Sequence, residues 1–442
     1  MKILWRQGLI WVLLCAGISA LWGTSLASSE NAWIDFRALF AGARCLIHRH
    51  DPYNVSDLSR EYASEDGQRP SATLSHLQGI VYCINLPATL ILVTPLALLN
   101  WKLAQVLWML LTGFAFVLAV LLTWLAGTRH APRIATVLAC VLAINCESIY
   151  SSGNSAGLVV GFCGIAVWCF LEGRFVRIGI VCLAIALAVK PHDAGFVWLL
   201  FILCGGVFRQ RALQSAAIAA VLSLASILWV AHVAPHWMRQ LDANIAATTA
   251  RGGINDCGPS SAVLRDGALY SVVDLQGAIS IFYNNPRVYN AASYAICGAL
   301  LLIWSIRSLR VSFTVPNAWL ALAPVTALTL LITYHRLWDA KLLILVIPAC
   351  CALWVEGTAI GKAAFWITAI ACLFTGEISL VLFEMAFGSF DMGGNRIMAH
   401  AINVVLTRPA SLALLTMAIF YLWVYIRRTH EGRPFNALNP NA

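Results

Sequence analysis

The chain has 442 residues, of which 60% are hydrophobic and only 11% charged, and its mean hydropathy is +0.78. This composition is typical of a polytopic membrane protein and excludes a soluble domain of useful size. Basic clusters beside the apolar runs largely explain the net charge of +9, so no nucleic-acid partner is expected. We predict a single all-α polytopic membrane domain over residues 1–442.

The first apolar run extends from about Leu9 to Leu26 and follows Lys2 and Arg6. It fits either a membrane span or a secretory signal peptide with a cleavage region at residues 26–28. We favour the span, because the run is long enough to cross a bilayer and the next segment suits a loop tethered there. Residues 28–79 then form a first external loop, whose helical pattern predicts interfacial helices.

Twelve further apolar segments lie near residues 80–101, 103–127, 134–150, 155–172, 176–190, 194–208, 212–233, 291–306, 316–334, 340–356, 363–387 and 411–426. Lys and Arg near span ends accumulate on the cytoplasmic side of a membrane. All the basic clusters fall on that side if segment 80–101 enters and leaves on one face. Pro87 and Pro95 interrupt its hydrogen bonding, which favours a re-entrant or broken helix. The sequence therefore predicts about twelve spans, with both termini and the tail 427–442 in the cytoplasm.

This topology gathers polar segments from distant parts of the sequence on the external face. They are residues 28–79, 151–154, 190–193, 334–339 and the long loop 234–290. Such a convergence of ionisable groups at the boundary between water and lipid is expected of an active site.

Asp35 is the most distinctive of these groups, because an isolated carboxylate between Trp33-Ile34 and Phe36 has little structural reason to be there. The other groups have plainer interpretations as well. The basic segment 44–49 also fits a solvated interfacial helix face that touches lipid headgroups. Lys190 also fits a side chain that snorkels from a span end, and 335–336 also fits a helix terminus.

Other chemical motifs are absent from the sequence. The fourteen cysteines are scattered, without a metal-type CxxC pair, and they are typical of small apolar residues in a membrane core. Cys45, Cys83 and Cys257 are the candidates for an external disulfide, and at least one of them must stay unpaired. No Walker-type phosphate loop, GxSxG elbow or HExxH motif occurs. We expect no metal and no cofactor.

Several short motifs occur in an order that resembles glycosyltransferase family 87. They are Asp35-Phe36 with Asp51-Pro52-Tyr53, Tyr82 with Asn85-Leu86-Pro87, Pro95-Leu96-Ala97-Leu98-Leu99, Gly153-Asn154, Ala184 through Lys190-Pro191, and Tyr334-His335-Arg336-Leu337-Trp338-Asp339. The resemblance covers about residues 30–350. It implies the fold of the glycosyltransferase-C superfamily, which includes polyprenol-phosphate-mannose-dependent alpha-mannosyltransferases.

The resemblance also implies a reaction. A hexose, with mannose as the family-based expectation, would pass with inversion from a polyprenyl-phosphate sugar to a hydroxyl of a lipid or glycan acceptor. The expected location is the external, periplasmic face of the plasma (inner) membrane.

The residues suit this chemistry independently. A hydroxyl that attacks an anomeric carbon needs a nearby carboxylate to take its proton, the role that we predict for Asp35. The departing phosphate needs cationic donors, which Lys190, His335 and Arg336 would supply. Four further residues complete the predicted substrate-binding set: Tyr53 and Asn154, for sugar or loop positioning, and His192 and Asp339.

The main alternative is a polytopic transporter or flippase for lipid-linked or small polar substrates, with a midplane site near the broken segments 80–101 and 190–193. It predicts internal repeats and ionisable groups in mid-span, whereas no convincing repeat is visible and the charges lie at span ends. A non-catalytic scaffold in envelope assembly is a third possibility. It would tolerate loss of Asp35, which the enzyme would not.

Overall fold

The computed structural model of the protein describes residues 2–26, 33–66, 82–259, 261, 272–311, 313–387 and 397–430. This part of the chain is almost entirely helical, and its only extended pairing is an isolated bridge between Val272 and Arg336. The predicted all-α class is therefore confirmed.

Seven helical segments of the described chain are long and apolar enough to cross a membrane. They are α1 (Lys2–Leu26), α7 (Pro132–Ile144) continued by α8 (Glu147–Ser151), α6 (Trp101–Thr128), α12 (Gly206–Val233), α16 (Pro286–Arg310), α17 (Val315–Ile332) and α22 (Pro409–His430). Five shorter apolar helices accompany them: α5 (Pro87–Ala97), α9 (Ala156–Glu172), α10 (Val176–Val189), α11 (Pro191–Cys204) and α19 (Ala359–Phe374). The protein is therefore a multi-pass membrane protein, and twelve crossings remain a prediction.

Helix α6 shows how the sequence builds such a segment. The Asn100 side chain caps its start by accepting a hydrogen bond from the backbone N–H of Leu103 at 3.0 Å. Its 28 residues span about 42 Å, more than the roughly 30 Å of a hydrocarbon core. It packs closely on α9, where a Cβ added to Gly161 would lie 2.6 Å from the carbonyl carbon of Ala115. Small residues thus bring the two backbones together.

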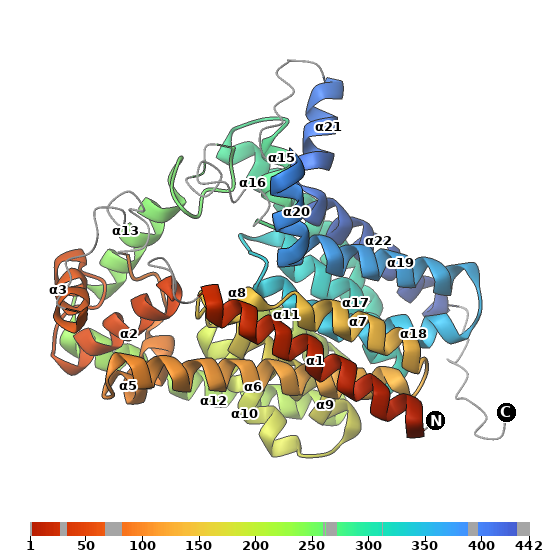
Figure 1. Ribbon diagram of the computed structural model, residues 1–442, viewed down its shortest axis with the longest axis horizontal. Coiled ribbons are helices and arrows are strands. Elements are labelled where there is room, and N and C mark those ends of the chain that lie inside the picture. The colour runs from red at the N-terminus through yellow and green to blue at the C-terminus, as the bar shows by residue number, and fades with distance from the viewer. Residues whose placement is uncertain are drawn as a thin grey trace.

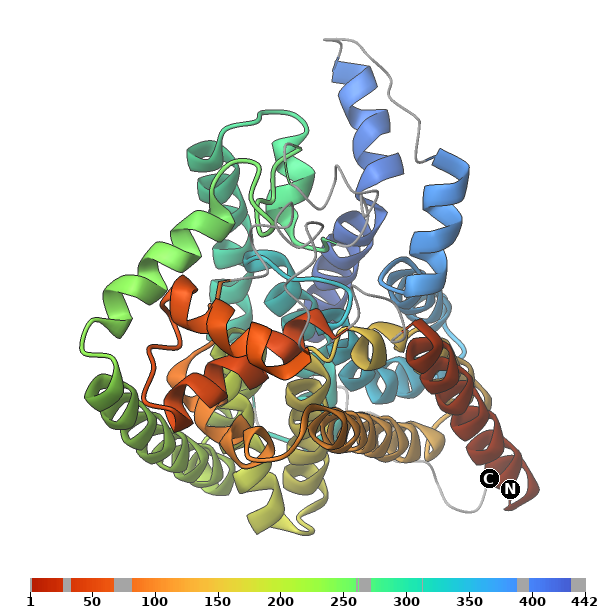
Figure 2. The same ribbon diagram turned by 60° about the vertical axis from the view of Figure 1, so that its left-hand side comes forward.

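The described part of the first loop contains the helices α2 (Ile34–Ile47) and α3 (Val55–Asp66), in keeping with the interfacial helices that the sequence predicted. In Figure 1 these helices lie at the left-hand end of the bundle, with α13 (Trp237–Thr249) of the long second loop beside them, and in Figure 2 this end is turned toward the viewer. The Asn244 side chain of α13 donates to the backbone carbonyls of Tyr53 at 2.9 Å and Cys83 at 3.1 Å. The two predicted external loops are therefore joined to each other.

Several predicted apolar segments are divided in the structure. Segment 80–101 contains only the short α5, which has Pro95 inside it, before α6 begins at Trp101. Segment 340–356 begins as the 3-10 helix η1 (Asp339–Val346) and continues as α18 (Ile347–Val355). Segment 363–387 becomes α19 and α20 (Glu377–Phe387). The described chain also contains α15 (Leu275–Ser280) and α21 (Ile397–Thr407).

A buried polar cluster explains the break between α19 and α20. A Cβ on Gly376 would lie 2.5 Å from the Asn145 side chain, so the chain approaches α7 closely at this point. Glu377 then pairs with the Lys341 ammonium at 2.9 Å and accepts a hydrogen bond from Ser148. Both charged side chains are buried, and burial without a partner would be costly for either.

Candidate active site

Asp35 occupies the second position of α2, and the start of this helix is bound to the turn that follows α8. The backbone N–H of Trp33 donates to the Ser151 carbonyl at 2.8 Å, and that of Asp35 donates to Ser152 at 3.2 Å. Trp33 adopts a left-handed conformation with φ 64°, which turns the chain into α2. These contacts fix the half-buried carboxylate beside the turn 151–154.

Gly153 makes that close approach possible. Its φ is +65°, and an added Cβ would lie 2.7 Å from the Cβ of Phe36 and 2.8 Å from the Trp33 ring. The Trp108 indole donates to the Gly153 carbonyl at 2.8 Å and holds the turn from the other side. A larger residue at 153 would therefore separate Asp35 from the next residue of the turn, Asn154.

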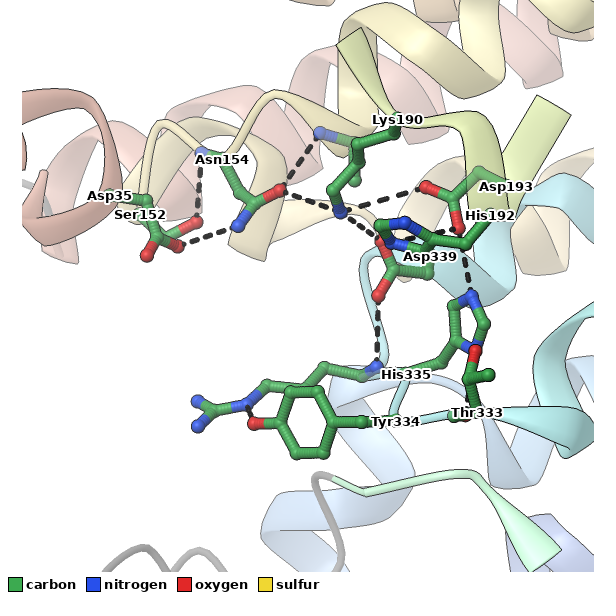
Figure 3. A network of polar contacts seen from close by, with 12 residues as sticks. Asp35, Ser152, Asn154, Lys190, His192, Asp193, Thr333, Tyr334, His335 and Asp339 are labelled. Carbon is green, nitrogen blue, oxygen red and sulfur yellow. Dashed lines mark hydrogen bonds and ion pairs between the residues drawn. The ribbon is translucent and has the colours of Figure 1, made fainter. Parts of the chain in front are cut away.

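Asn154 connects Asp35 to the rest of the polar network (Figure 3). Its Nδ2 donates to Oδ2 of Asp35 at 2.9 Å. Its Oδ1 accepts from the backbone N–H of Ala156 at 2.8 Å and from the Lys190 Nζ at 3.3 Å. Among the described residues none donates to Oδ1 of Asp35, so this oxygen is available to a substrate.

Lys190 lies at the break between α10 and α11, with φ −139° and ψ 81°. Pro191 lacks an N–H and begins the next helix, which explains the interruption. The Lys190 ammonium contacts Asp339 Oδ1 at 2.6 Å and Asp193 Oδ2 at 3.6 Å, besides Asn154. Two hydrogen bonds and one longer ion pair therefore hold this cation.

His335 is fully buried, and both of its ring nitrogens face acceptors. Nε2 lies 2.9 Å from Asp193 Oδ1, and Nδ1 lies 2.8 Å from the Thr333 carbonyl. A carboxylate and a carbonyl accept hydrogen bonds and do not donate them, so both nitrogens carry a proton and the ring is an imidazolium. Burial alone would lower the pKa of His335, but the Asp193 carboxylate outweighs it and raises the pKa above its ordinary value.

Arg336 differs from the other two cations in having no carboxylate partner for its guanidinium among the described residues. Its side chain donates to the Tyr334 hydroxyl and, at 2.9 Å, to the Ile254 carbonyl. The guanidinium carbon also lies 5.3 Å from the centre of the Trp338 ring. Its backbone N–H donates to Asp339 Oδ2 at 3.0 Å, which connects the positions of the two residues.

The network contains three carboxylates, those of Asp35, Asp193 and Asp339, and three cations. Burial raises the pKa of Asp35 above its usual range. The hydrogen bond from Asn154 and the charges of Arg336 and Lys190 act in the opposite direction, and they do not fully compensate for burial. Asp35 is therefore a stronger base than an exposed aspartate.

Two predicted site residues have other surroundings. The exposed His192 lies beside the network, with its ring centre 5.3 Å from that of His335. Tyr53 is only 1% exposed, and its hydroxyl donates to the Asn85 carbonyl at 2.8 Å. Its contacts fit the loop-positioning alternative and not direct contact with a sugar.

Sequence reasoning named the turn that contains Asp193 but left this residue out of the site. The i, i+3 spacing from Lys190 was the available signal, because residues three apart face each other at the start of a helix. The buried pair of Lys341 and Glu377 was also missed, since each residue lies in a run that hydropathy alone assigns to a span.

Among the described residues, two groups of side chains are close enough to hold a metal ion, which the sequence did not lead us to expect. They are His192, Asp193 and His335, and, in the first loop, His48, His50 and Glu61. In the first group His335 already uses both nitrogens, and the Lys190 ammonium lies 3.6 Å from Asp193. A divalent cation would be repelled there, so we interpret the first group as part of the ion-pair network.

No family model and no curated protein matches this sequence. A solved structure that is similar to the chain is the archaeal oligosaccharyltransferase AglB from Archaeoglobus fulgidus in complex with an inhibitory peptide and a dolichol-phosphate. The sequences are 11% identical, the TM-score is 0.35, and the match covers 94% of this chain and 56% of AglB. The chain thus spans little more than half the length of that protein. A similarity of this size does not establish a shared fold, so the function is inferred from the site itself.

Proposed function

We propose that the protein is a membrane glycosyltransferase of the glycosyltransferase-C type. It would move a hexose, by family resemblance mannose, from a polyprenyl-phosphate sugar to a hydroxyl of a lipid or glycan acceptor. The observation that carries the proposal is the continuous network from Asp35 through Asn154 to Lys190 and Asp339, built from four distant segments of the chain. Such a network supports the proposal because it brings a carboxylate close to cationic side chains.

Asp35 has the properties of a general base. One carboxylate oxygen is held by Asn154 and the other has no donor in the described part of the chain, so this second oxygen can accept the proton of an acceptor hydroxyl. The raised pKa of the carboxyl group strengthens it as a base. Binding to the turn at Ser151 and Ser152 fixes its position, which productive geometry requires.

The cations suit a phosphate leaving group. Arg336 is the best candidate for direct contact, because carboxylates already occupy Lys190 and His335 whereas the Arg336 guanidinium binds only neutral oxygens in the described structure. Lys190 and His335 would act in two ways, by adding positive potential and by holding Asp339 and Asp193 in place. The sequence-based expectation assigned the phosphate to Lys190, His335 and Arg336 together, without this division of roles.

The reaction then balances without a further reactant. The acceptor oxygen attacks the anomeric carbon as its proton passes to Asp35, and a new glycosidic bond forms. The bond from the anomeric carbon to the phosphate oxygen breaks, and its electron pair leaves with the polyprenyl phosphate. Attack opposite to the leaving group inverts the anomeric configuration. A tail embedded in the bilayer with its phosphate at the interface matches a site built at the ends of membrane helices.

The test is an assay of the purified full-length protein with radiolabelled polyprenyl-phosphate hexoses and a total lipid extract from the host. We expect a labelled glycolipid or glycan product with the wild type and none with Asp35→Asn. Transfer of label across a vesicle membrane without a new product would instead support the transporter. The same assay with the Asp51→Asn variant controls for loss of a carboxylate in the same loop.

A further inference from the structure

We propose that His48, His50 and Glu61 form a binding site for a zinc-type divalent ion, which fastens the end of α2 to α3 in the first loop. His48 Nδ1 lies 2.8 Å from Glu61 Oε1, and His50 Nδ1 lies 3.2 Å from the same oxygen. All three potential ligand atoms lie within 4.8 Å of one another. This inference concerns a site outside the polar network around Asp35.

The backbone between the two histidines brings them to the same carboxylate. Arg49 has a left-handed conformation with φ 59°, which is unfavourable for a residue other than glycine. The N–H of His50 donates to the Cys45 carbonyl at 2.7 Å and so closes the end of α2. Consequently the side chains on either side of Arg49 converge on Glu61, which reaches them from α3.

The spacing suits a tetrahedral ion. Zinc bonds to histidine nitrogen and carboxylate oxygen at about 2.0–2.2 Å, which places neighbouring ligand atoms about 3.3 Å apart. Two of the three separations, 2.8 and 3.2 Å, are already close to this value, and the third, between the two histidine nitrogens, is at most 4.8 Å. An ion could therefore replace the shared hydrogens after a modest shift of the side chains. Two nitrogens and one oxygen favour zinc or a similar transition metal over magnesium or calcium, which prefer oxygen ligands.

The surroundings also resemble those of a metal site. Arg44 lies 3.4 Å from the second oxygen of Glu61, and a ligating carboxylate is usually held by such an outer partner. The Glu61 side chain is only 5% exposed, whereas those of His48 and His50 are 44% and 34% exposed. The carboxylate is thus fixed from the protein side, while the two imidazoles leave an entry path and room for a water as fourth ligand.

The location points to a structural role. His48 follows Asp35 by thirteen residues along α2, so the two ends of the helix are about 20 Å apart. An ion at one end cannot touch a substrate at the other. It would instead hold α2, which carries Asp35, against α3.

Zinc binding to the full-length protein in detergent, first stripped with a chelator, tests the proposal. Affinity would be measured by competition with a chromogenic chelator, and the geometry by the visible absorption of bound Co²⁺. We expect one ion per chain and a rise in melting temperature on zinc addition. Each ligand variant should weaken zinc affinity strongly: His48→Ala, His50→Ala and Glu61→Gln. The expected loss is larger than the roughly 10- to 100-fold loss of metal affinity that follows removal of a residue that only holds a ligand in place. His236→Ala, at an exposed histidine of the second loop, should leave it unchanged.

Two further variants keep the test decisive. Arg44→Gln retains all three ligands and should weaken zinc binding by about 10- to 100-fold even if a ligand variant fails to fold. His192→Ala examines the other group of potential ligands. The proposal is overturned if the wild type binds no zinc at micromolar concentration, or if binding is lost in His192→Ala and kept in His48→Ala.

Discussion

Replacing Asp35 by asparagine is the most direct perturbation of the proposed reaction. In the wild type, Asn154 donates to one carboxylate oxygen and leaves the other free. Asparagine can still accept that hydrogen bond through its own oxygen, and its amide nitrogen then occupies the place of the free oxygen. The shape and the contact to Asn154 are retained, but the group that faces the acceptor donates a proton and cannot take one.

Transfer should therefore fall by at least about a hundredfold, the lower limit of the usual 10²- to 10⁴-fold contribution of a general base. Binding of the donor should persist, because the change removes a negative charge and leaves the cations in place. Asp35→Glu should be nearly as damaging, since an added methylene shifts the carboxylate beyond a productive geometry. The assay is product formation from a radiolabelled polyprenyl-phosphate hexose, with donor binding measured separately.

Asp51→Asn is the matched control. Asp51 lies in the same loop, and its carboxylate accepts a hydrogen bond from the Tyr53 backbone at 2.9 Å. This variant should retain turnover at saturating substrate. Near-normal turnover in Asp35→Asn would refute the assignment of the base, and a large loss in Asp51→Asn alone would transfer that assignment to Asp51.

Three further predictions concern the cations and the topology. Lys190→Ala should lower activity roughly thirtyfold or more, since loss of a charge-assisted contact costs about 2–4 kcal/mol; activity within threefold of wild type would remove Lys190 from the site. If Lys190 mainly neutralises Asp339, adding Asp339→Asn should restore the melting temperature of Lys190→Ala. Arg336→Gln should move the acid limb of the pH–rate profile to higher pH. In the wild type the Arg336 charge lowers the pKa of Asp35, so removing this charge raises that pKa and the base form is lost at a higher pH. Arg336→Lys keeps the charge and should leave the limb in place. A cysteine at the exposed position 192, in a cysteine-depleted protein, should react with an impermeant reagent from the external side, and labelling only from the cytoplasm would contradict the topology.

The sequence identified most of the residues in the network because they interrupt long apolar runs. Lys190-Pro191 divides two short helices, and Gly153-Asn154 stands between two others. A charged or amide side chain at such a break is conspicuous against a hydrophobic background. The alternation of basic clusters predicts that they lie on one face of the membrane. The structure brings Asp35, Asn154, Lys190 and Asp339 into contact, and the membrane face stays a prediction.

The partners within the network could not be predicted, because a pairing between distant segments depends on how the helices pack. The sequence presented Lys190 as a cation for phosphate, whereas the structure directs it at Asp339 and Asp193. Likewise His335 is an imidazolium only because Asp193 and the Thr333 carbonyl both lie within hydrogen-bonding distance. Neither fact is visible in spacing along the chain.

Hydropathy also overestimates the continuity of helices. Segment 363–387 is apolar enough to resemble one span, yet the chain bends at Gly376 so that Glu377 can reach Lys341. Segment 340–356 begins as a 3-10 helix for eight residues. A polar contact that breaks a helix contributes one or two residues to a hydropathy average, so its effect is hidden in the apolar background.

The arrangement of charges around Asp35 explains how one site can serve both the attacking and the departing group. In the proposed reaction the donor is a phosphodiester with one negative charge, and Asp35 carries another. As the acceptor proton reaches Asp35, this carboxylate becomes neutral while the departing phosphate gains its second charge. Negative charge therefore moves from Asp35 toward the phosphate without changing the total in the site. Arg336, whose guanidinium has no carboxylate partner in the described structure, is the cation that can follow this movement, whereas Lys190 and His335 remain with their own carboxylates.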